Sequence, residues 1–250
     1  VTLLKLFDSH IDEILVQLRE KRKAGKVTDT IPQYGDAWPG AGNRDLVMGK
    51  DTAVELGNPR EGSMAFLVWS NEPTRLKSRR ISVIGPDLGA LVGKRVSFGK
   101  IVMLGGEAFN ADNSYERYRQ LESVRYALRL KGYMMRGVSQ YGREWSRVSH
   151  DAIDAGFSFS VLGDALARRF LDVEFIRSVE IIFITAGMED MRPFVPIAER
   201  ALRIINAMHK MVEEVTFDCE SCEYSDVCRD VQELNAMRKL LEKRRAPIDD

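Results

Sequence analysis

Three cysteines, Cys219, Cys222 and Cys228, follow the pattern C-x2-C-x5-C within ten residues of this 250-residue chain. An odd number of cysteines so close in sequence argues against a disulfide framework. Thiolates are soft ligands that suit iron–sulfur clusters and zinc, and tight spacing lets one loop surround one metal centre. We therefore predict a metal site formed by these three residues.

Iron and zinc are alternatives for this site, and each needs one further ligand. A [4Fe–4S] cluster on three cysteines leaves one iron for a non-cysteine ligand, a partner's residue or a substrate, and an open iron could act as a Lewis acid. Zinc would take His209 or a carboxylate such as Asp218. Residues 213–233 hold eight acidic residues against Arg229 alone, which favours a Zn2+ cation over an anionic cluster. A loop that binds no metal is the third alternative.

The middle of the chain is rich in basic residues. Residues 74–100 hold seven Lys or Arg against one acidic residue, and residues 117–147 hold eight against two. Arg binds phosphate through bidentate, charge-assisted hydrogen bonds, so this region is a candidate anion site, although a basic face can also be merely solvated. The whole chain has 37 basic and 37 acidic residues, and this balance gives no indication of nucleic acid as a partner.

The spacing of apolar residues indicates the elements that must position these groups. It predicts an α/β or α+β fold, a mixed sheet with flanking helices, an N-terminal amphipathic helix and a C-terminal helical tail that contains the cysteines. Asp190 is the expected cap of a long helix, and His10 is expected on a helix surface. The expected helices are 3–24, 113–131, 161–170, the helix after Asp190 and a last one from Val231, and the expected strands are 52–56, 64–69, 80–84, 100–104 and 179–185.

Glycines and prolines within residues 25–50 mark one expected boundary, and the cysteine segment marks a second. Residues 1–50 would be a helix and an irregular linker, 51–213 an α/β domain, and 214–250 the cysteine loop and a last helix. No apolar run approaches the ~20 residues that a membrane helix needs, so we expect a cytoplasmic protein that does not bind a membrane. The exposed amphipathic helix and the missing fourth metal ligand predict a homo-oligomer or a partner subunit.

Four stretches of the chain carry a family resemblance. In order and approximate separation they resemble the middle domain of the beta subunit of the acetyl-CoA synthase/CO dehydrogenase complex, from about residue 51 to 228. The stretches are Val54-Glu55-Leu56-Gly57-Asn58-Pro59; Ile81-Ser82-Val83-Ile84-Gly85-Pro86-Asp87-Leu88; Gln140 with Trp145-Ser146-Arg147-Val148-Ser149-His150-Asp151-Ala152 and Gly156-Phe157; and Phe217-Asp218-Cys219-Glu220-Ser221-Cys222 with Val227-Cys228.

This resemblance implies an iron–sulfur centre and a coenzyme A site. In that family four cysteines hold the iron–sulfur part and a downstream Cys-Gly-Cys holds nickel, and the centre joins a methyl group, CO and coenzyme A. Here the gap between Cys222 and Cys228 is shorter, and neither a fourth cysteine nor Cys-Gly-Cys is present in the sequence. We therefore do not expect this chain to form the full nickel centre.

Coenzyme A carries three phosphates, so basic residues of the middle are its candidate ligands. The candidates are Arg79, Arg80, Arg136, Arg143 and Arg147, with Trp145 either stacked on adenine or part of the core. The expected function is an acetyl-CoA-synthase-like subunit that binds coenzyme A or an acyl-CoA. With a partner subunit it would assist acyl transfer or carbon–carbon bond formation on a thioester. The alternatives are a non-catalytic metal-binding interaction module and a cluster enzyme whose open iron binds an acyl-CoA carbonyl.

Overall fold

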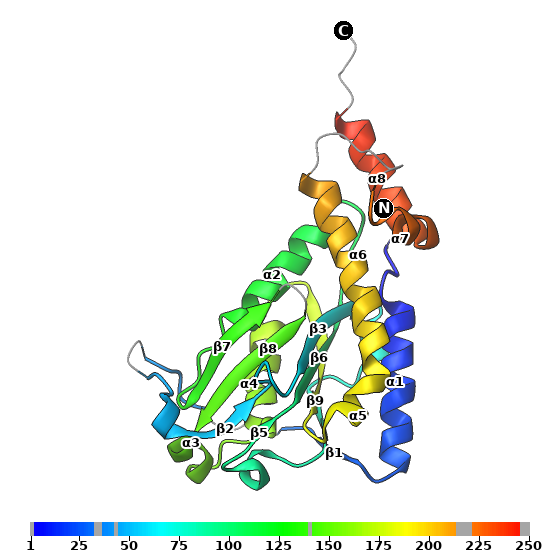
Figure 1. Ribbon diagram of the computed structural model, residues 1–250. Helices are drawn as coiled ribbons and strands as arrows, with labels where there is room; N and C mark the ends of the chain where they lie inside the picture. Colours follow the sequence, from blue (N-terminus) through cyan, green and yellow to red (C-terminus); the bar gives the residue numbers. More distant parts are fainter. Residues whose placement is uncertain (1–2, 33–36, 43–44, 140–141, 214–221, 246–250) are drawn as a thin grey trace.

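The computed structural model describes residues 3–32, 37–42, 45–139, 142–213 and 222–245. Two mixed β-sheets form its body, with helices packed around them (Figure 1). The expected α/β class with an N-terminal helix is confirmed. The strands are β1 (Val27–Thr30), β2 (Thr52–Leu56), β3 (Ser63–Ser70), β4 (Arg80–Ile84), β5 (Arg95–Val96), β6 (Phe98–Gly106), β7 (Tyr133–Ser139), β8 (Arg143–Ser149) and β9 (Ile176–Ile184).

The helices connect and cover these strands. The α-helices are α1 (Asp8–Lys23), α2 (Ser114–Tyr126), α3 (His150–Asp154), α4 (Phe159–Leu171), α5 (Met188–Met191), α6 (Val195–Glu213), α7 (Ser225–Asp230) and α8 (Gln232–Arg245). Short 3-10 helices are η1 (Gly49–Asp51), η2 (Pro73–Arg75), η3 (Leu88–Leu91) and η4 (Arg192–Phe194). Among the helices of the described residues, none combines the length and apolar character needed to span a bilayer.

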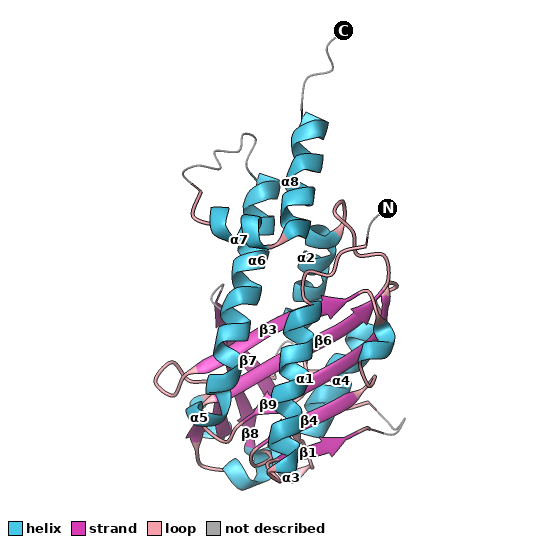
Figure 2. Ribbon diagram, turned by 90° about the vertical axis from the view of Figure 1, so that its right-hand side faces the viewer, coloured by secondary structure: helices cyan, strands magenta, loops and turns pink. Residues whose placement is uncertain are grey.

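The larger sheet has the strand order β1-β4-β9-β6-β3. Its pairs β4/β9 and β6/β3 are parallel, whereas β1/β4 and β9/β6 are antiparallel. Helices α1 and α6 lie side by side over one face (Figure 2), and α4 packs on the other. Gly163 of α4 makes this contact close, because a Cβ there would lie 2.7 Å from the side chain of Ile81. Both faces are therefore buried, as the apolar strands β6 and β9 require.

The smaller sheet has the order β5-β2-β8-β7. Its strand β8 joins the larger sheet at the edge strand β3, where the Gly142 carbonyl accepts a hydrogen bond from the Ala65 backbone N–H and Ser63 Oγ accepts one from Glu144. Gly57 completes the junction with a φ of 65°. A Cβ at Gly57 would lie 2.2 Å from the Glu144 carbonyl oxygen, so no other residue fits there without a backbone shift.

Several expected elements are confirmed. The strands expected at 52–56 and 80–84 are β2 and β4 with the same bounds. Ser149 caps α3 by accepting a hydrogen bond from the Ala152 N–H. Strands β7 and β8 were not predicted, and neither was β1, which lies within the segment expected to be irregular.

Two single-residue expectations were wrong. Asp190 does not cap the long helix: it lies inside α5, and its carboxylate binds Lys21 at 2.6 Å and Lys26 at 3.3 Å near the end of α1. The cause is Pro193, which opens the 3-10 turn η4 and separates α5 from α6. His10 is not a surface residue, because it is buried on the side of α1 that packs against the core.

Candidate functional site

Strand β8 presents alternating side chains to solvent and to the interior. Arg143 is exposed and Trp145 and Arg147 are half-buried, whereas Glu144, Ser146 and Val148 are buried. This period of two is the geometry of a strand with one covered face. Trp145, Arg143 and Arg147 therefore share the outer face of the smaller sheet, which places three of the six predicted anion-binding residues together.

Glu55 anchors this outer face. It lies opposite Arg147 of β8 on one side and Arg95 of β5 on the other. Its carboxylate accepts hydrogen bonds from Arg147 Nε at 3.1 Å and Trp145 Nε1 at 3.0 Å, and from Asn58 Nδ2 at 3.2 Å. Arg95 Nε completes the group with an ion pair at 3.0 Å. Four side chains, from β5, from β8 and from Asn58 after β2, are thus held around one carboxylate.

The charge state of Glu55 follows from these contacts. Burial alone would raise the pKa of this carboxyl group, but hydrogen bonds from Arg147, Trp145 and Asn58 more than offset that effect and lower the pKa below its ordinary value. Glu55 is therefore ionised at neutral pH. An ionised carboxylate fixes the orientation of its donors, since charge-assisted hydrogen bonds are stronger than neutral ones.

Two guanidinium groups lie near the indole ring of Trp145. Arg136 of β7 stands 5.0 Å from the ring centroid and Arg147 stands 5.6 Å from it. Both distances are within the range of cation–π attraction. We call the group Glu55, Arg95, Arg136, Arg143, Trp145 and Arg147 the Trp145 surface. It presents four cationic side chains, an aromatic ring and one almost buried carboxylate.

A buried ionic network lies on the opposite face of the same strand. Lys100 of β6 pairs with Glu144 of β8, and both side chains are essentially inaccessible. Tyr133 donates a hydrogen bond to Glu144 at 3.2 Å, and its hydroxyl also bonds with Ser146 at 3.0 Å. Burial lowers the pKa of Lys100, partly offset by the charge of Glu144. The network ties β8 to the larger sheet directly behind the Trp145 surface.

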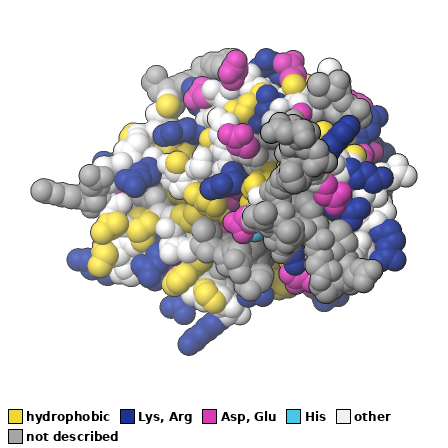
Figure 3. Space-filling model, turned by 90° about the horizontal axis from the view of Figure 1, so that it is seen from above, with side chains coloured by type: hydrophobic (Ala, Val, Ile, Leu, Met, Phe, Trp, Pro, Cys, Tyr) yellow, Lys and Arg dark blue, Asp and Glu magenta, His cyan; other side chains and the backbone are white. Residues whose placement is uncertain are grey.

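Arg79 and Arg80 lie apart from the other predicted anion-binding residues. Arg79, at φ 63°, pairs with Asp164 of α4, and Arg80 pairs with Glu180 at 2.6 Å on the larger sheet. The basic middle therefore does not form one surface. On the face shown in Figure 3, Lys and Arg side chains are also scattered among acidic and hydrophobic ones rather than gathered in one block.

The cysteine segment lies at the start of the helical tail. Cys222 and Cys228 are half-buried, and the Tyr224 N–H lies 3.5 Å from Cys222 Sγ as a hydrogen-bond donor. Cys219 lies outside the described residues, as does Asp218. Within the described ranges, no three His, Cys, Asp or Glu side chains gather closely enough to hold a metal ion. A site with all three thiols would depend on Cys219.

His209, the other proposed zinc ligand, has partners of its own. Its Nδ1 forms a hydrogen bond with the Tyr115 hydroxyl, and its Nε2 lies 3.2 Å from Glu213. Its two ring nitrogens are thus occupied by α2 and by the next turn of α6. These contacts favour a structural role for His209 at the end of α6.

The sequence patterns did not predict a site role for Glu55, although the residue lies in the first resemblance-bearing stretch. Glu55 is the charged residue in the apolar strand β2, and such a residue is buried only when it is paired. Its four partners come from Asn58, β5 and β8, so the pairing appears only once β8 is recognised as a strand. The first and third resemblance-bearing stretches meet at this carboxylate, which neither stretch predicts alone.

The fold and the Trp145 surface define a mixed α/β protein with two sheets and an arginine-rich outer face. A sequence model of the CO dehydrogenase/acetyl-CoA synthase complex beta subunit matches residues 34–189, which is more than half of the chain. The chain therefore belongs to that family. The match includes both sheets except β1, and it ends before the cysteines.

One curated relative adds to this result. Carbon monoxide dehydrogenase/acetyl-CoA synthase subunit alpha of Moorella thermoacetica is 25% identical over 184 residues, which are 71% of this chain and 24% of that protein. The chain thus spans about a quarter of the length of this relative. The expected kinship is confirmed, while the individual site residues stay predictions.

Proposed function

We propose that this chain is an acetyl-CoA-synthase-like subunit that binds coenzyme A or an acyl-CoA at the Trp145 surface. With a partner subunit it would assist acyl transfer or carbon–carbon bond formation on the thioester. The observation that carries the proposal is that Arg136 and Arg147 both lie near the Trp145 ring, whose Nε1 is held by Glu55, on a sheet within the family match.

The chemistry of the Trp145 surface suits the adenine nucleotide end of coenzyme A. A guanidinium group has five N–H donors, so Arg147 and Arg95 keep donors for phosphate oxygens while one N–H of each faces Glu55. Arg136 and Arg143 are exposed and add positive charge beside them. The indole ring offers a flat surface for adenine, and base–aromatic stacking contributes about 1–3 kcal/mol.

We further propose that Cys219, Cys222 and Cys228 hold an iron–sulfur cluster, with zinc as the alternative. The N–H of Tyr224 directed at Cys222 Sγ supports a thiolate at that position, since hydrogen bonds to sulfur stabilise negative charge and tune cluster potentials. When bound, the metal would supply an electrophilic centre. The chain's own thiols would only hold and orient it.

Isothermal titration calorimetry at low salt tests the coenzyme A proposal. Arg147→Ala should weaken coenzyme A binding by about 1–3 kcal/mol, because one charged hydrogen bond is lost, and affinity should fall as ionic strength rises. Arg119→Ala is the matched control, since Arg119 is an exposed arginine of α2 outside the Trp145 surface. Absence of coenzyme A binding to intact, metal-loaded protein would refute the proposal.

The position of the cysteines favours one alternative, a non-catalytic metal-binding interaction module. The cysteines follow the family match and belong to a helical tail in which α7 and α8 pack on the end of α6. Such a tail could hold a metal that organises a contact with a partner subunit. Metal-dependent association without coenzyme A binding would support this function in place of the first.

A further inference from the structure

A second group of basic side chains surrounds a hollow between α1 and the start of β4. The hollow has a volume of about 520 Å³, and among the residues that the structure describes no acidic one lines it. Five of the eight lining residues are cationic, and two of them come from α1, before the family match begins. The lining residues are Leu15, Arg19, Arg22, Thr74, Arg75, Leu76, Lys77 and Arg80.

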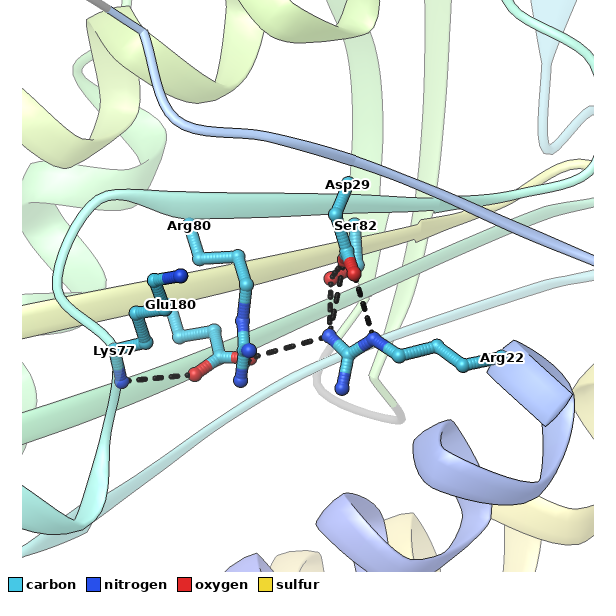
Figure 4. Close-up of polar contacts among 6 residues, drawn as sticks. All are labelled: Arg22, Asp29, Lys77, Arg80, Ser82 and Glu180. Atoms are coloured by element: carbon cyan, nitrogen blue, oxygen red, sulfur yellow. Dashed lines mark hydrogen bonds and ion pairs between the residues drawn. The ribbon is translucent and has the colours of Figure 1, made fainter.

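Two of the five cations are fixed from behind by the sheet (Figure 4). Arg22 binds Asp29 through Nε at 2.7 Å and Nη2 at 2.9 Å, and Ser82 Oγ donates to Asp29 at 2.6 Å. Arg80 Nε donates to Glu180 at 2.7 Å, and Glu180 is fully buried. The carboxylate of Glu180 is buried and that of Asp29 is partly exposed, and neither residue is among those that line the hollow, so they orient Arg80 and Arg22 from outside it.

Arg75, which also lines the hollow, is held by acidic side chains too. It pairs with Asp12 at 2.6 Å and with Glu72 at 3.1 Å. Its Nε is buried and has no hydrogen-bond partner among the described residues. A buried donor without a partner costs about 1–3 kcal/mol and calls for an acceptor such as a water molecule or an ion.

The remaining two cations have no such restraint. Arg19 and Lys77 are exposed, and in the described part of the chain neither side chain has a carboxylate within ion-pair distance. The backbone N–H of Lys77 is used by Glu180 at 3.2 Å, which fixes the start of its side chain at the rim. The hollow thus combines three guanidinium groups that carboxylates hold in place, those of Arg22, Arg75 and Arg80, with the exposed side chains of Arg19 and Lys77, which a ligand can contact.

We propose that this hollow, the Arg19–Lys77 hollow, binds a phosphate group, either as free phosphate or as part of a small phosphate monoester. Arginine is suited to bidentate contact with phosphate oxygens, and lysine acts as a point charge beside it. Leu15 and Leu76 supply an apolar side for the organic part of an ester. The volume lies within the range of ordinary small-ligand sites.

This site is independent of the Trp145 surface. Its ligands come from α1, η2 and the start of β4, whereas the Trp145 surface belongs to β2, β5, β7 and β8 of the other sheet. It therefore does not rest on the proposed coenzyme A site, and either can fail without the other.

Calorimetric titration of the full chain with inorganic phosphate and, separately, with glycerol phosphate tests the proposal at low salt. We expect saturable binding of at least one probe, weakened about tenfold by Arg19→Ala combined with Lys77→Ala, since each loses a charge-assisted contact. Both residues are exposed, so the double variant should fold, which circular dichroism would check. Arg119→Ala, at an exposed arginine of α2 that belongs to neither this hollow nor the Trp145 surface, is the matched control and should leave phosphate binding unchanged.

The two probes also identify the form of the ligand. Tighter binding of glycerol phosphate would support the proposal with a monoester that also contacts Leu15 and Leu76. Equal affinity would support it with free phosphate as the ligand. No binding of either probe, or binding that the Arg19→Ala and Lys77→Ala double variant leaves unchanged, would overturn it.

Discussion

The ammonium group of Lys100 on β6 forms an ion pair with the carboxylate of Glu144 on β8, and both side chains are buried where the two sheets meet. Burial alone would raise the pKa of Glu144, but the charges of Lys100 and Arg125 more than offset it and hold that pKa below its ordinary value. Glu144 is therefore ionised at neutral pH. Because Trp145 follows Glu144 in the chain, the pair also fixes the strand that carries the candidate site.

Breaking this pair from one side should strongly destabilise the fold. We expect Lys100→Met to lower the free energy of unfolding by about 3–5 kcal/mol, because Glu144 would be left buried and unpaired. Urea denaturation at neutral pH measures the change. The double variant Lys100→Met, Glu144→Leu should recover part of the loss, since no buried charge then lacks its partner. A single variant as stable as the wild type would show that the pair is not buried in solution.

The buried His10 should make stability depend on pH. Burial, followed by the charge of Arg200, lowers the pKa of His10 from 6.5 to about 4, so the unfolded state binds the extra proton more readily. The contribution of neutral His10 to stability is full above pH 6.5 and is lost as the pH falls toward 4, by roughly 3 kcal/mol in total. In urea denaturation from pH 7 to 5, His10→Leu should show a flatter profile than the wild type. Parallel profiles would contradict this assignment.

Glu55 should matter both for stability and for the candidate ligand. Glu55→Ala removes the acceptor shared by Arg147 and Trp145, so we expect a loss of about 1–3 kcal/mol in unfolding free energy. Coenzyme A affinity should fall as well, because the guanidinium and indole groups lose their fixed positions. Glu61→Ala, an exposed acid on the loop after β2, is the control for a simple change in charge. Unchanged coenzyme A affinity in Glu55→Ala would exclude a positioning role.

The apolar strands could be predicted from sequence because β-branched apolar residues dominate them. β4 and β9 are rich in Ile and Val, and nearly all of their residues are buried, which is typical of a central strand. The class of fold follows from such strands alternating with amphipathic helices. The family could be identified from short motifs, because they are recognised in the sequence without knowing how they pack.

The strand that carries the candidate site could not be predicted in the same way. β8 places polar residues on both faces, and Glu144 faces the interior only because Lys100, forty-four positions earlier, is there to pair with it. The local spacing of polar and apolar residues gives no indication of that ion pair. For the same reason the role of Glu55 could not be predicted, because its partners come from β5 and β8. The division of the basic residues into two separate groups could not be predicted either, because it depends on which strands lie side by side.

Metal content tests the cysteine proposal separately from the rest. Protein purified without oxygen should contain about four iron atoms per chain if the three cysteines hold one [4Fe–4S] cluster. Cys222→Ser should remove the metal and leave coenzyme A affinity nearly unchanged, because Cys222 and the Trp145 surface lie in different segments. Elemental analysis that finds stoichiometric zinc and no iron would contradict the iron–sulfur assignment.

Fluorescence of Trp145 during titration with coenzyme A tests the central proposal most directly. The chain has three tryptophans, and Trp69 is buried while Trp38 lies between other hollows, so stacking of adenine should quench Trp145 alone. We expect saturable quenching in the wild type, loss of that quenching in Trp145→Phe, and retention in Trp38→Phe. Quenching that persists unchanged in Trp145→Phe, or no quenching at concentrations where calorimetry detects binding, would show that coenzyme A does not bind at this surface.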